Sequence, residues 1–232
     1  MALIENMEPK VLTTIAIAAL TLAAVIVVTG QYRKPRWWLG RLFLRMMNAR
    51  HSRVTDWGLQ QVPLEKHFTM LDVGCGGGRT IQKLAAIASE GKVYGIDHSA
   101  ASVAAARGAN AQTIAEDRVD IQQGSVSDLP FPNNMFDVVT AVETHYYWPD
   151  LIADLREIRR VLKPGGRLVV IAETYKGRRF DAFFRPAMKL LRATYLSVSE
   201  HREMLSAAGY SGTAVLEEPK KGWICAIGRR PM

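Results

Sequence analysis

The stretch that decides the fold is Leu71-Asp72-Val73-Gly74-Cys75-Gly76-Gly77-Gly78-Arg79-Thr80, in which four glycines occupy five consecutive positions. A β-rich run, residues 68–74, leads into the glycines, and a helical pattern follows them. Because glycine has no side chain, a ligand can approach the backbone closely, and the start of a helix offers amide groups without intrahelical partners. The stretch therefore predicts a strand, a ligand-binding turn and a helix in succession.

The rest of the chain continues this alternation of strand and helix. Strands are expected at 68–74, 92–97, 118–123, 136–142 and 167–173. A helix with one apolar face is expected at 150–162, ended by Lys163-Pro164-Gly165-Gly166, and further helices at 181–192 and 199–208. The runs TAVLEE and GWICAIG can pair as a closing antiparallel hairpin. The alternation is typical of a parallel sheet covered by helices on both faces.

The glycine spacing excludes two other nucleotide-binding turns. Counted from Gly74, a dinucleotide GxGxxG would need its third glycine at Arg79, and no GK[ST] of a phosphate P-loop follows. Asp97 ends the expected strand 92–97, nineteen residues beyond Gly78. A carboxylate there can accept hydrogen bonds from both hydroxyls of a ribose, although an isolated Asp at a strand end more often caps a helix.

An acid followed by GxGxG after the first strand, then an acid at the end of the second, resembles the class I S-adenosylmethionine-dependent methyltransferase family. Gly124-Ser125-Val126 after the third strand, Phe136-Asp137 and LKPGG extend the resemblance over most of residues 54–230. It implies an α/β, Rossmann-like doubly wound, mostly parallel seven-stranded sheet with an antiparallel last strand. It also implies an enzyme that uses S-adenosylmethionine and releases S-adenosylhomocysteine.

The same resemblance implies a set of residues that hold the cofactor. They are Asp72, Gly74, Cys75, Gly76, Gly78, Asp97, His98, Ser125, Val126 and Val142. Ser125 departs from the family pattern, which often has an acid there to meet the adenine amine. Backbone groups of Ser125 and Val126 can still recognise the adenine.

The fourth strand runs into Glu143-Thr144-His145-Tyr146-Tyr147-Trp148, at the edge of the sheet where ligands bind in open α/β folds. Methyl transfer is an in-line displacement, so the enzyme mainly aligns the acceptor and excludes water. Aromatic faces suit this task, and the acceptor pocket is expected to contain Tyr146, Tyr147, Trp148 and Tyr175. For an acceptor that must lose a proton, Glu143 and His145 are the candidate bases. Alternatively, Glu143 touches the cofactor and His145 packs.

Residues 47–58 lie where many members of this family carry a helix over the cofactor. His51 and Trp57 in that segment can contact ligand, but such residues on a docking helix more often serve packing. The two cysteines, Cys75 and Cys225, are too far apart in sequence for a metal-type motif, so we expect free thiols and no metal.

The amino-terminal segment has the character of a membrane anchor. Residues 11–29 contain no charge and as a helix would span roughly 28 Å. Glu5 and Glu8 precede this run and YRKPR follows it, which argues against a cleaved signal peptide. A buried core helix is the alternative. We expect a transmembrane anchor (1–30), a basic and aromatic juxtamembrane or lid helix (31–53) and a methyltransferase domain (54–232).

The formal net charge of +8 is concentrated in one place, because residues 31–53 hold seven basic residues and no acid. Residues from Val54 onward carry only about +2. The positive-inside rule then places the catalytic domain in the cytoplasm, on a single-pass membrane protein. Nucleic acid is not expected as a partner, since the globular part is nearly neutral.

These patterns predict a methyltransferase acting on a small-molecule acceptor, with a lipid or quinone as the hypothesis, at the cytoplasmic membrane face. The alternative is a membrane-anchored scaffold that binds the cofactor without catalysis. The acceptor, the methylated atom and the oligomeric state stay open at this point.

Overall fold

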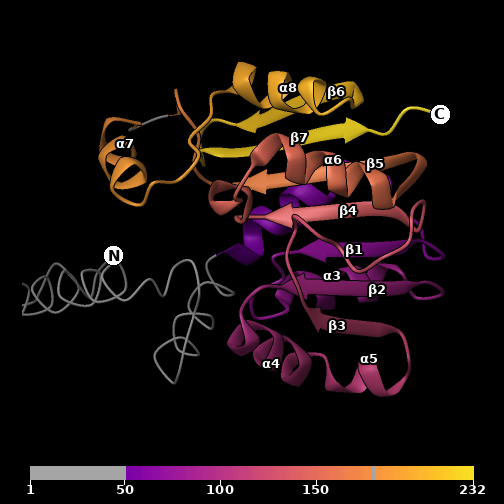
Figure 1. Cartoon of the computed structure of the whole chain (residues 1–232). Coiled ribbons are helices and arrows are strands. Elements are labelled where there is room, and N and C mark those ends of the chain that lie inside the picture. Colours follow the sequence, from indigo (N-terminus) through magenta and orange to yellow (C-terminus); the bar gives the residue numbers. More distant parts are fainter. Residues whose placement is uncertain (1–50, 179–180) are drawn as a thin grey trace, which may run out of the picture.

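A seven-stranded sheet forms the centre of the protein (Figure 1). The computed structural model describes residues 51–178 and 181–232. The strand order is β3-β2-β1-β4-β5-β7-β6, and neighbouring pairs among β1 to β5 are parallel, whereas β7 runs antiparallel to both β5 and β6. The strands are β1 (Thr69–Val73), β2 (Lys92–Asp97), β3 (Val119–Gln123), β4 (Phe136–Val142), β5 (Leu162–Ala172), β6 (Ser211–Glu218) and β7 (Trp223–Arg229). The predicted Rossmann-like sheet and its closing hairpin are confirmed.

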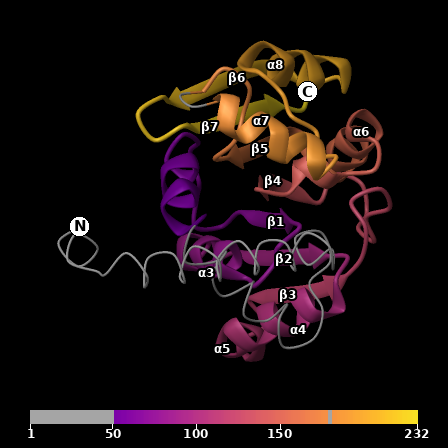
Figure 2. The same cartoon turned by 90° about the vertical axis from the view of Figure 1, so that its left-hand side faces the viewer.

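Helices cover both faces of this sheet. They are α3 (Arg79–Ile87), α4 (Ala100–Ala109), α5 (Ala111–Ala115), α6 (Leu151–Val161), α7 (Asp181–Leu190) and α8 (Val198–Ala207), with a 3₁₀ turn η1 (His145–Tyr147) and helical residues at 51–59. Figure 2 shows α3 and the first helix on one side of the sheet and α6 on the other. The helices expected at 150–162, 181–192 and 199–208 are confirmed to within two residues at each end.

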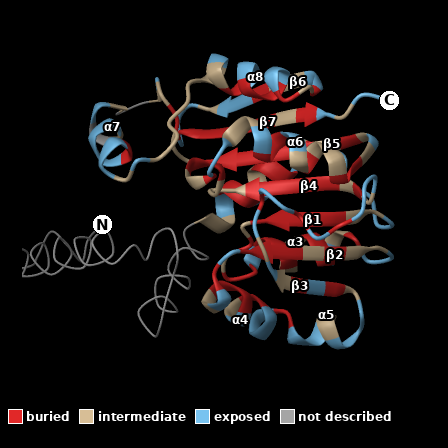
Figure 3. Ribbon diagram, viewed as in Figure 1, coloured by how far each residue is buried: buried red, intermediate tan, exposed pale blue. Residues whose placement is uncertain are grey.

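Central strands supply side chains to two separate apolar cores. In β4, Val138 packs in the core with α3 and α4, whereas Val139 packs in the core with α6 and α8. In β5, Val169 packs in the core with α3 and α4, and Val170 packs in the core with α6 and α8. Because both faces are buried, these strands read as continuous apolar runs, and Figure 3 shows them buried along most of their length.

The fifth strand begins earlier than the expected range of 167–173. Leu162 already pairs with Phe136 as α6 ends, and the register then shifts before Arg167 pairs with Val138. The Pro-Gly-Gly segment fills this irregularity. Lys163 at its start forms an ion pair with the Asp137 carboxylate at 2.7 Å. The Lys-Pro-Gly-Gly segment that ends α6 therefore already belongs to β5. Sequence patterns that place glycine and proline between a helix and an apolar run do not predict this overlap.

The expected membrane anchor, residues 11–29, and most of the juxtamembrane segment, residues 31–50, lie outside the described residues. Within 51–178 and 181–232, no helix is both long and apolar enough to cross a membrane. Both cysteines are free thiols in the apolar interior, as expected.

Candidate functional site

The glycine turn between β1 and α3 is held against the end of β2. Gly74 and Cys75 both donate their amides to the Ile96 carbonyl, at 2.8 and 3.0 Å. Gly74 has a φ of +72°, and a Cβ atom there would overlap the Thr144 side chain that follows β4. Glycine is therefore needed both for the backbone conformation and for the close contact between the first and fourth strands.

Gly78 has a different role, because it packs the start of α3 against α4. Its φ is +80°, and a Cβ atom would lie 2.8 Å from the Ala106 Cα and 2.6 Å from Asn110 Nδ2. The Asn110 amide donates to the carbonyls of both Gly78 and Ala106, at 3.1 and 2.8 Å. Gly78 thus fixes where α3 begins and does not itself line the cavity described below.

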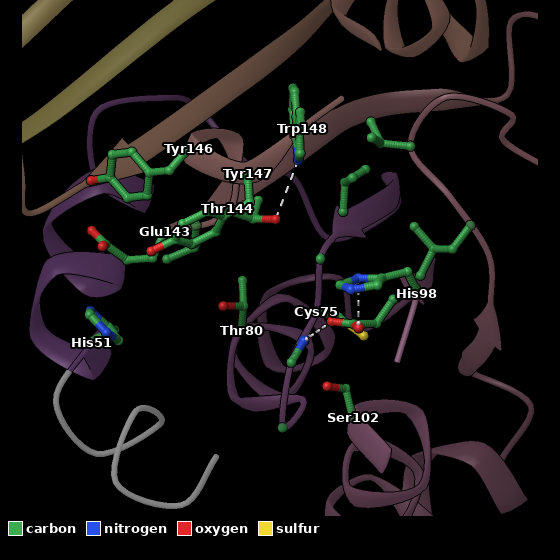
Figure 4. A pocket seen from close by; sticks show the side chains of 18 of the residues that line it. His51, Cys75, Thr80, His98, Ser102, Glu143, Thr144, Tyr146, Tyr147 and Trp148 are labelled. Carbon is green, nitrogen blue, oxygen red and sulfur yellow. Dashed lines mark hydrogen bonds and ion pairs between the residues drawn. The ribbon is translucent and has the colours of Figure 1, made fainter. Parts of the chain in front are cut away.

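Asp97 ends β2 with its carboxylate held by the glycine turn. Gly76 donates its amide to one carboxylate oxygen at 2.9 Å, and Ser99 donates to the other at 2.8 Å. The ring of His98 lies 3.6 Å from the same carboxylate (Figure 4). A carboxylate oxygen accepts more than one hydrogen bond, so each retains capacity for a ligand hydroxyl.

A cavity of about 630 Å³ connects this carboxylate with the carboxyl end of β4 (Figure 4). Most residues expected to bind cofactor or acceptor line it: Gly74, Cys75, Gly76, Asp97, His98, Ser125, Val126, Val142, Glu143, Tyr146, Tyr147 and Trp148. The structure therefore brings the two expected halves of the site together in one space. Asp72, Gly78, His145 and Tyr175 lie outside its wall.

Asp72 lies in the interior beneath the turn, only 2% exposed. Thr140 of β4 donates its hydroxyl to the Asp72 carboxyl at 2.7 Å. Burial nevertheless raises the pKa of Asp72 to about 7, against a usual value of 3.8. The residue braces β1 against β4 behind the cavity.

His145 turns away from the cavity into the core. Its ring is fully buried, stacked 4.3 Å from the Tyr146 ring and 5.5 Å from the His201 ring. Neither ring nitrogen has a hydrogen-bond partner in the described part of the chain, and burial lowers the pKa of His145 well below 6.5. Glu143 has a φ of +56° just before it, and this left-handed turn separates the two side chains. The two candidate bases are therefore not brought together.

The aromatic wall is held in place by hydrogen bonds. Tyr146 donates its hydroxyl to the Thr174 carbonyl at 3.0 Å and accepts the Thr174 amide at 3.2 Å, while burial raises the pKa of Tyr146 well above 10. Trp148 donates its indole N–H to the Thr144 hydroxyl at 3.3 Å. Tyr175, next to Thr174, is buried behind this wall, and burial also raises its pKa. These rings present fixed surfaces to the cavity.

Sequence reasoning missed Glu173 altogether and could not decide the role of His51. His51 lines the cavity from the helix at 51–59, and its Nδ1 lies 3.4 Å from the Glu173 carboxylate that follows β5. The Glu173 amide in turn donates to the Glu143 carboxylate. An acid at the end of the fifth strand was the available signal, since parallel strands meet ligands at that edge.

Known proteins match the segment that builds this site. Residues 71–170 match the family model described as a methyltransferase domain. These residues are therefore similar to a methyltransferase domain. The chain is 35% identical over 119 residues to 27-O-demethylrifamycin SV methyltransferase of Amycolatopsis mediterranei, covering 51% of this chain and 43% of that protein. It is 38% identical over 115 residues to demethylmenaquinone methyltransferase of Symbiobacterium thermophilum, covering 49% and 46%.

The chain also shares its fold with solved structures. A SAM dependent methyltransferase from Aquifex aeolicus superposes with a TM-score of 0.67 at 22% identity, over 81% of this chain and 96% of the other. The chain spans about half the length of the two curated relatives above.

The residues that line the cavity fit S-adenosylmethionine, the cofactor that the sequence predicts. The Asp97 carboxylate is suited to the ribose hydroxyls, and the glycine turn gives open backbone for the amino-acid part. Ser125 and Val126 line the cavity beside Asp97, where backbone groups can meet the adenine. When bound, the cofactor supplies an activated methyl group on a sulfonium centre.

Proposed function

We propose that this protein transfers a methyl group from S-adenosylmethionine to a small quinone-like acceptor at the cytoplasmic face of a membrane. The observation that carries the proposal is the continuous cavity between Asp97 and the aromatic wall. Its volume of about 630 Å³ falls within the usual range for small-molecule sites. The surfaces expected to bind cofactor and acceptor thus face one shared space.

The lining of the cavity supports a flat, largely apolar acceptor. Tyr146, Tyr147 and Trp148 line the end nearest β4, and Met188 of α7 adds a flexible apolar side chain. The demethylmenaquinone methyltransferase among the relatives is named for a quinone acceptor. A planar quinol ring matches this surface better than a charged or strongly hydrated acceptor does.

The membrane location is supported by the amino-terminal sequence alone. Residues 11–29 carry no charge, and the basic residues of 31–53 follow them. Such an anchor would keep the domain beside acceptors dissolved in the bilayer. It would also place the domain in the compartment that contains S-adenosylmethionine.

Cofactor binding is tested by calorimetric titration of the full-length protein in mild detergent, with S-adenosylmethionine and with NADH. Asp97→Ala should abolish saturable binding of S-adenosylmethionine, because it removes the only carboxylate that lines the cavity at the end of β2. Asp120→Ala is the matched control, since Asp120 is an exposed carboxylate on neighbouring β3. Binding of NADH alone, or equal binding by the Asp97 variant, contradicts the assignment.

The acceptor and the membrane location need a second experiment. Membranes containing the full-length protein are washed with alkaline carbonate, and methyl transfer is assayed with a 2-prenyl-1,4-naphthohydroquinone kept reduced under nitrogen. We expect the protein to stay in the membrane and to methylate the quinol. The proposal fails if protein lacking residues 1–30 methylates a water-soluble acceptor as well as the full chain does, and neither methylates any component of a lipid extract.

A further inference from the structure

His51 and Glu143 line the side of the cavity away from His98 and Ser102 (Figure 4), and Glu173, which does not line it, contacts both residues. We call His51, Glu143 and Glu173 the imidazole–carboxylate cluster. His51 Nδ1 lies 3.4 Å from Glu173 Oε2, and the Glu173 amide donates to Glu143 Oε1. The side chains of His51 and Glu173 are only 14% and 15% exposed. The cluster connects the helical residues 51–59 to the ends of β4 and β5, which lie tens of residues to more than a hundred residues later in the sequence.

The other groups that line the cavity are poor proton acceptors. The Tyr146 hydroxyl is occupied in both hydrogen-bonding roles by the Thr174 backbone, and its pKa is raised by burial. Burial also raises the pKa of the Cys75 thiol well above 9. His98 lies against Asp97 at the ribose end. Glu143 accepts a backbone amide, which favours its ionised form and weakens it as a base.

His51 has the geometry that a base requires. A carboxylate facing Nδ1 favours the tautomer with its proton on that atom, which leaves the lone pair on Nε2. Both ring nitrogens are buried and neither makes a hydrogen bond among the described residues, so the contact of Nδ1 with Glu173 is an ion-pair contact only. A buried polar atom without a partner costs about 1–3 kcal/mol, and a ligand hydroxyl in the cavity would remove that penalty. The 3.4 Å contact with Glu173 is an ion-pair distance, of the kind that shortens once substrate is bound.

We propose that His51 is the catalytic base of this domain and that Glu173 is its positioning residue, an inference that rests on the proposed function. The acceptor hydroxyl gives its proton to His51 Nε2. The electron pair left on the oxygen, or delocalised onto a carbon of the hydroxylated ring, forms the new bond to the methyl carbon. The carbon–sulfur bond breaks and its electrons stay on sulfur. When a ring carbon is the attacking atom, that carbon then loses its hydrogen to water as a proton, and the electrons of the carbon–hydrogen bond restore the aromatic ring.

Glu173 acts by fixing the ring and by stabilising the imidazolium that forms. A carboxylate within ion-pair distance attracts the positive charge that the imidazole gains on proton transfer. Glu143 holds the Glu173 backbone and thereby places the carboxylate. Glu143 has a left-handed backbone conformation at the end of β4, and its carboxylate accepts the Glu173 amide from that position.

The test uses the full-length protein in detergent with the prenyl naphthohydroquinone as acceptor. His51→Gln should lower kcat by about 10²–10⁴-fold, the usual contribution of a general base, while the Kd for S-adenosylmethionine changes less than about threefold. Glu173→Gln should lower kcat less and move the acidic limb of the kcat–pH profile to lower pH. His67→Gln is the matched control, because His67 is an exposed histidine away from the cavity.

A second readout does not need turnover. The tautomer of His51 is measured by NMR on protein carrying ¹⁵N-labelled histidine, with His51→Gln assigning the resonances. The wild type should carry its proton on Nδ1, and Glu173→Ala, which removes the facing carboxylate, should reduce the share of this tautomer, whereas His67→Gln should leave it unchanged. An unchanged tautomer in Glu173→Ala overturns the role of Glu173, and turnover by His51→Gln within about threefold of the wild type overturns the base. Wild-type protein that binds S-adenosylmethionine but methylates no quinol instead refutes the proposed function and, with it, the base.

Discussion

Replacing Gly78 with alanine should destabilise the domain severely, because two independent penalties act at this position. The φ of +80° is a left-handed conformation that costs a residue with a Cβ atom roughly 1–2 kcal/mol. The added methyl group would also lie 2.8 Å from the Ala106 Cα, a backbone atom that cannot rotate away. Forced overpacking of this kind costs about 1–3 kcal/mol. Together they lower the free energy of unfolding by roughly 2–5 kcal/mol.

The matched control is Gly108→Ala, in the same helix α4 that Gly78 contacts. A Cβ atom at Gly108 meets nothing within 4 Å, and alanine is a better helix former than glycine by about 1 kcal/mol. We therefore expect Gly108→Ala to be neutral or slightly stabilising. Both variants are compared by urea unfolding, monitored by tryptophan fluorescence on the full-length protein in detergent. The packing argument is refuted if Gly78→Ala unfolds at the same urea concentration as Gly108→Ala.

Three further changes test groups in the cavity wall and behind it, with unfolding measured in the absence of cofactor. Burial raises the Asp72 pKa from 3.8 to about 7, so the free energy of unfolding should fall by roughly 4 kcal/mol as pH rises from 4 to above 7. In Asp72→Asn, the free energy of unfolding measured by urea titration should depend much less on pH. A pH dependence equal to that of the wild type contradicts the role of Asp72. Burial lowers the His145 pKa, so stability should instead drop as pH falls below 6.5. His145→Phe should abolish this acid sensitivity and keep S-adenosylmethionine binding in calorimetry, whereas loss of binding would return His145 to the site. Tyr146→Phe leaves the Thr174 amide and carbonyl without their side-chain hydrogen-bond partner, so it should lower the free energy of unfolding by about 1–3 kcal/mol. Thermal unfolding measures this loss, with Tyr147→Phe as the control.

Local pattern was sufficient to predict the positions of most strands and of the glycine turn at one end of the cavity. The limits of β2 and β4 agree with the predicted ranges, because each is an apolar run ended by a polar residue or a turn. Gly74 and Asp97 were predictable for a similar reason. The glycine turn, the strand end and the distance between them are all short-range features of the chain.

The acceptor end depends on contacts that sequence spacing does not encode. His145 and Tyr146 are adjacent in η1, yet one ring enters the core and the other lines the cavity, because the left-handed backbone at Glu143 sets their directions. Tyr175 is placed behind the wall by tertiary packing in the same way. The contact between His51 and Glu173 joins elements far apart in sequence. Only the assembled sheet determines such pairs.

The position of β7 between β5 and β6 has a consequence for biosynthesis. The strand that fills the gap between β5 and β6 comes after both of them in chain order, since β7 begins at Trp223. Until it emerges from the ribosome, β6 has no neighbour and β5 presents an open, apolar edge. This part of the sheet therefore closes only after β7 has left the ribosome, and a nonsense codon at residue 223, which removes β7, would yield a chain that exposes this edge and aggregates.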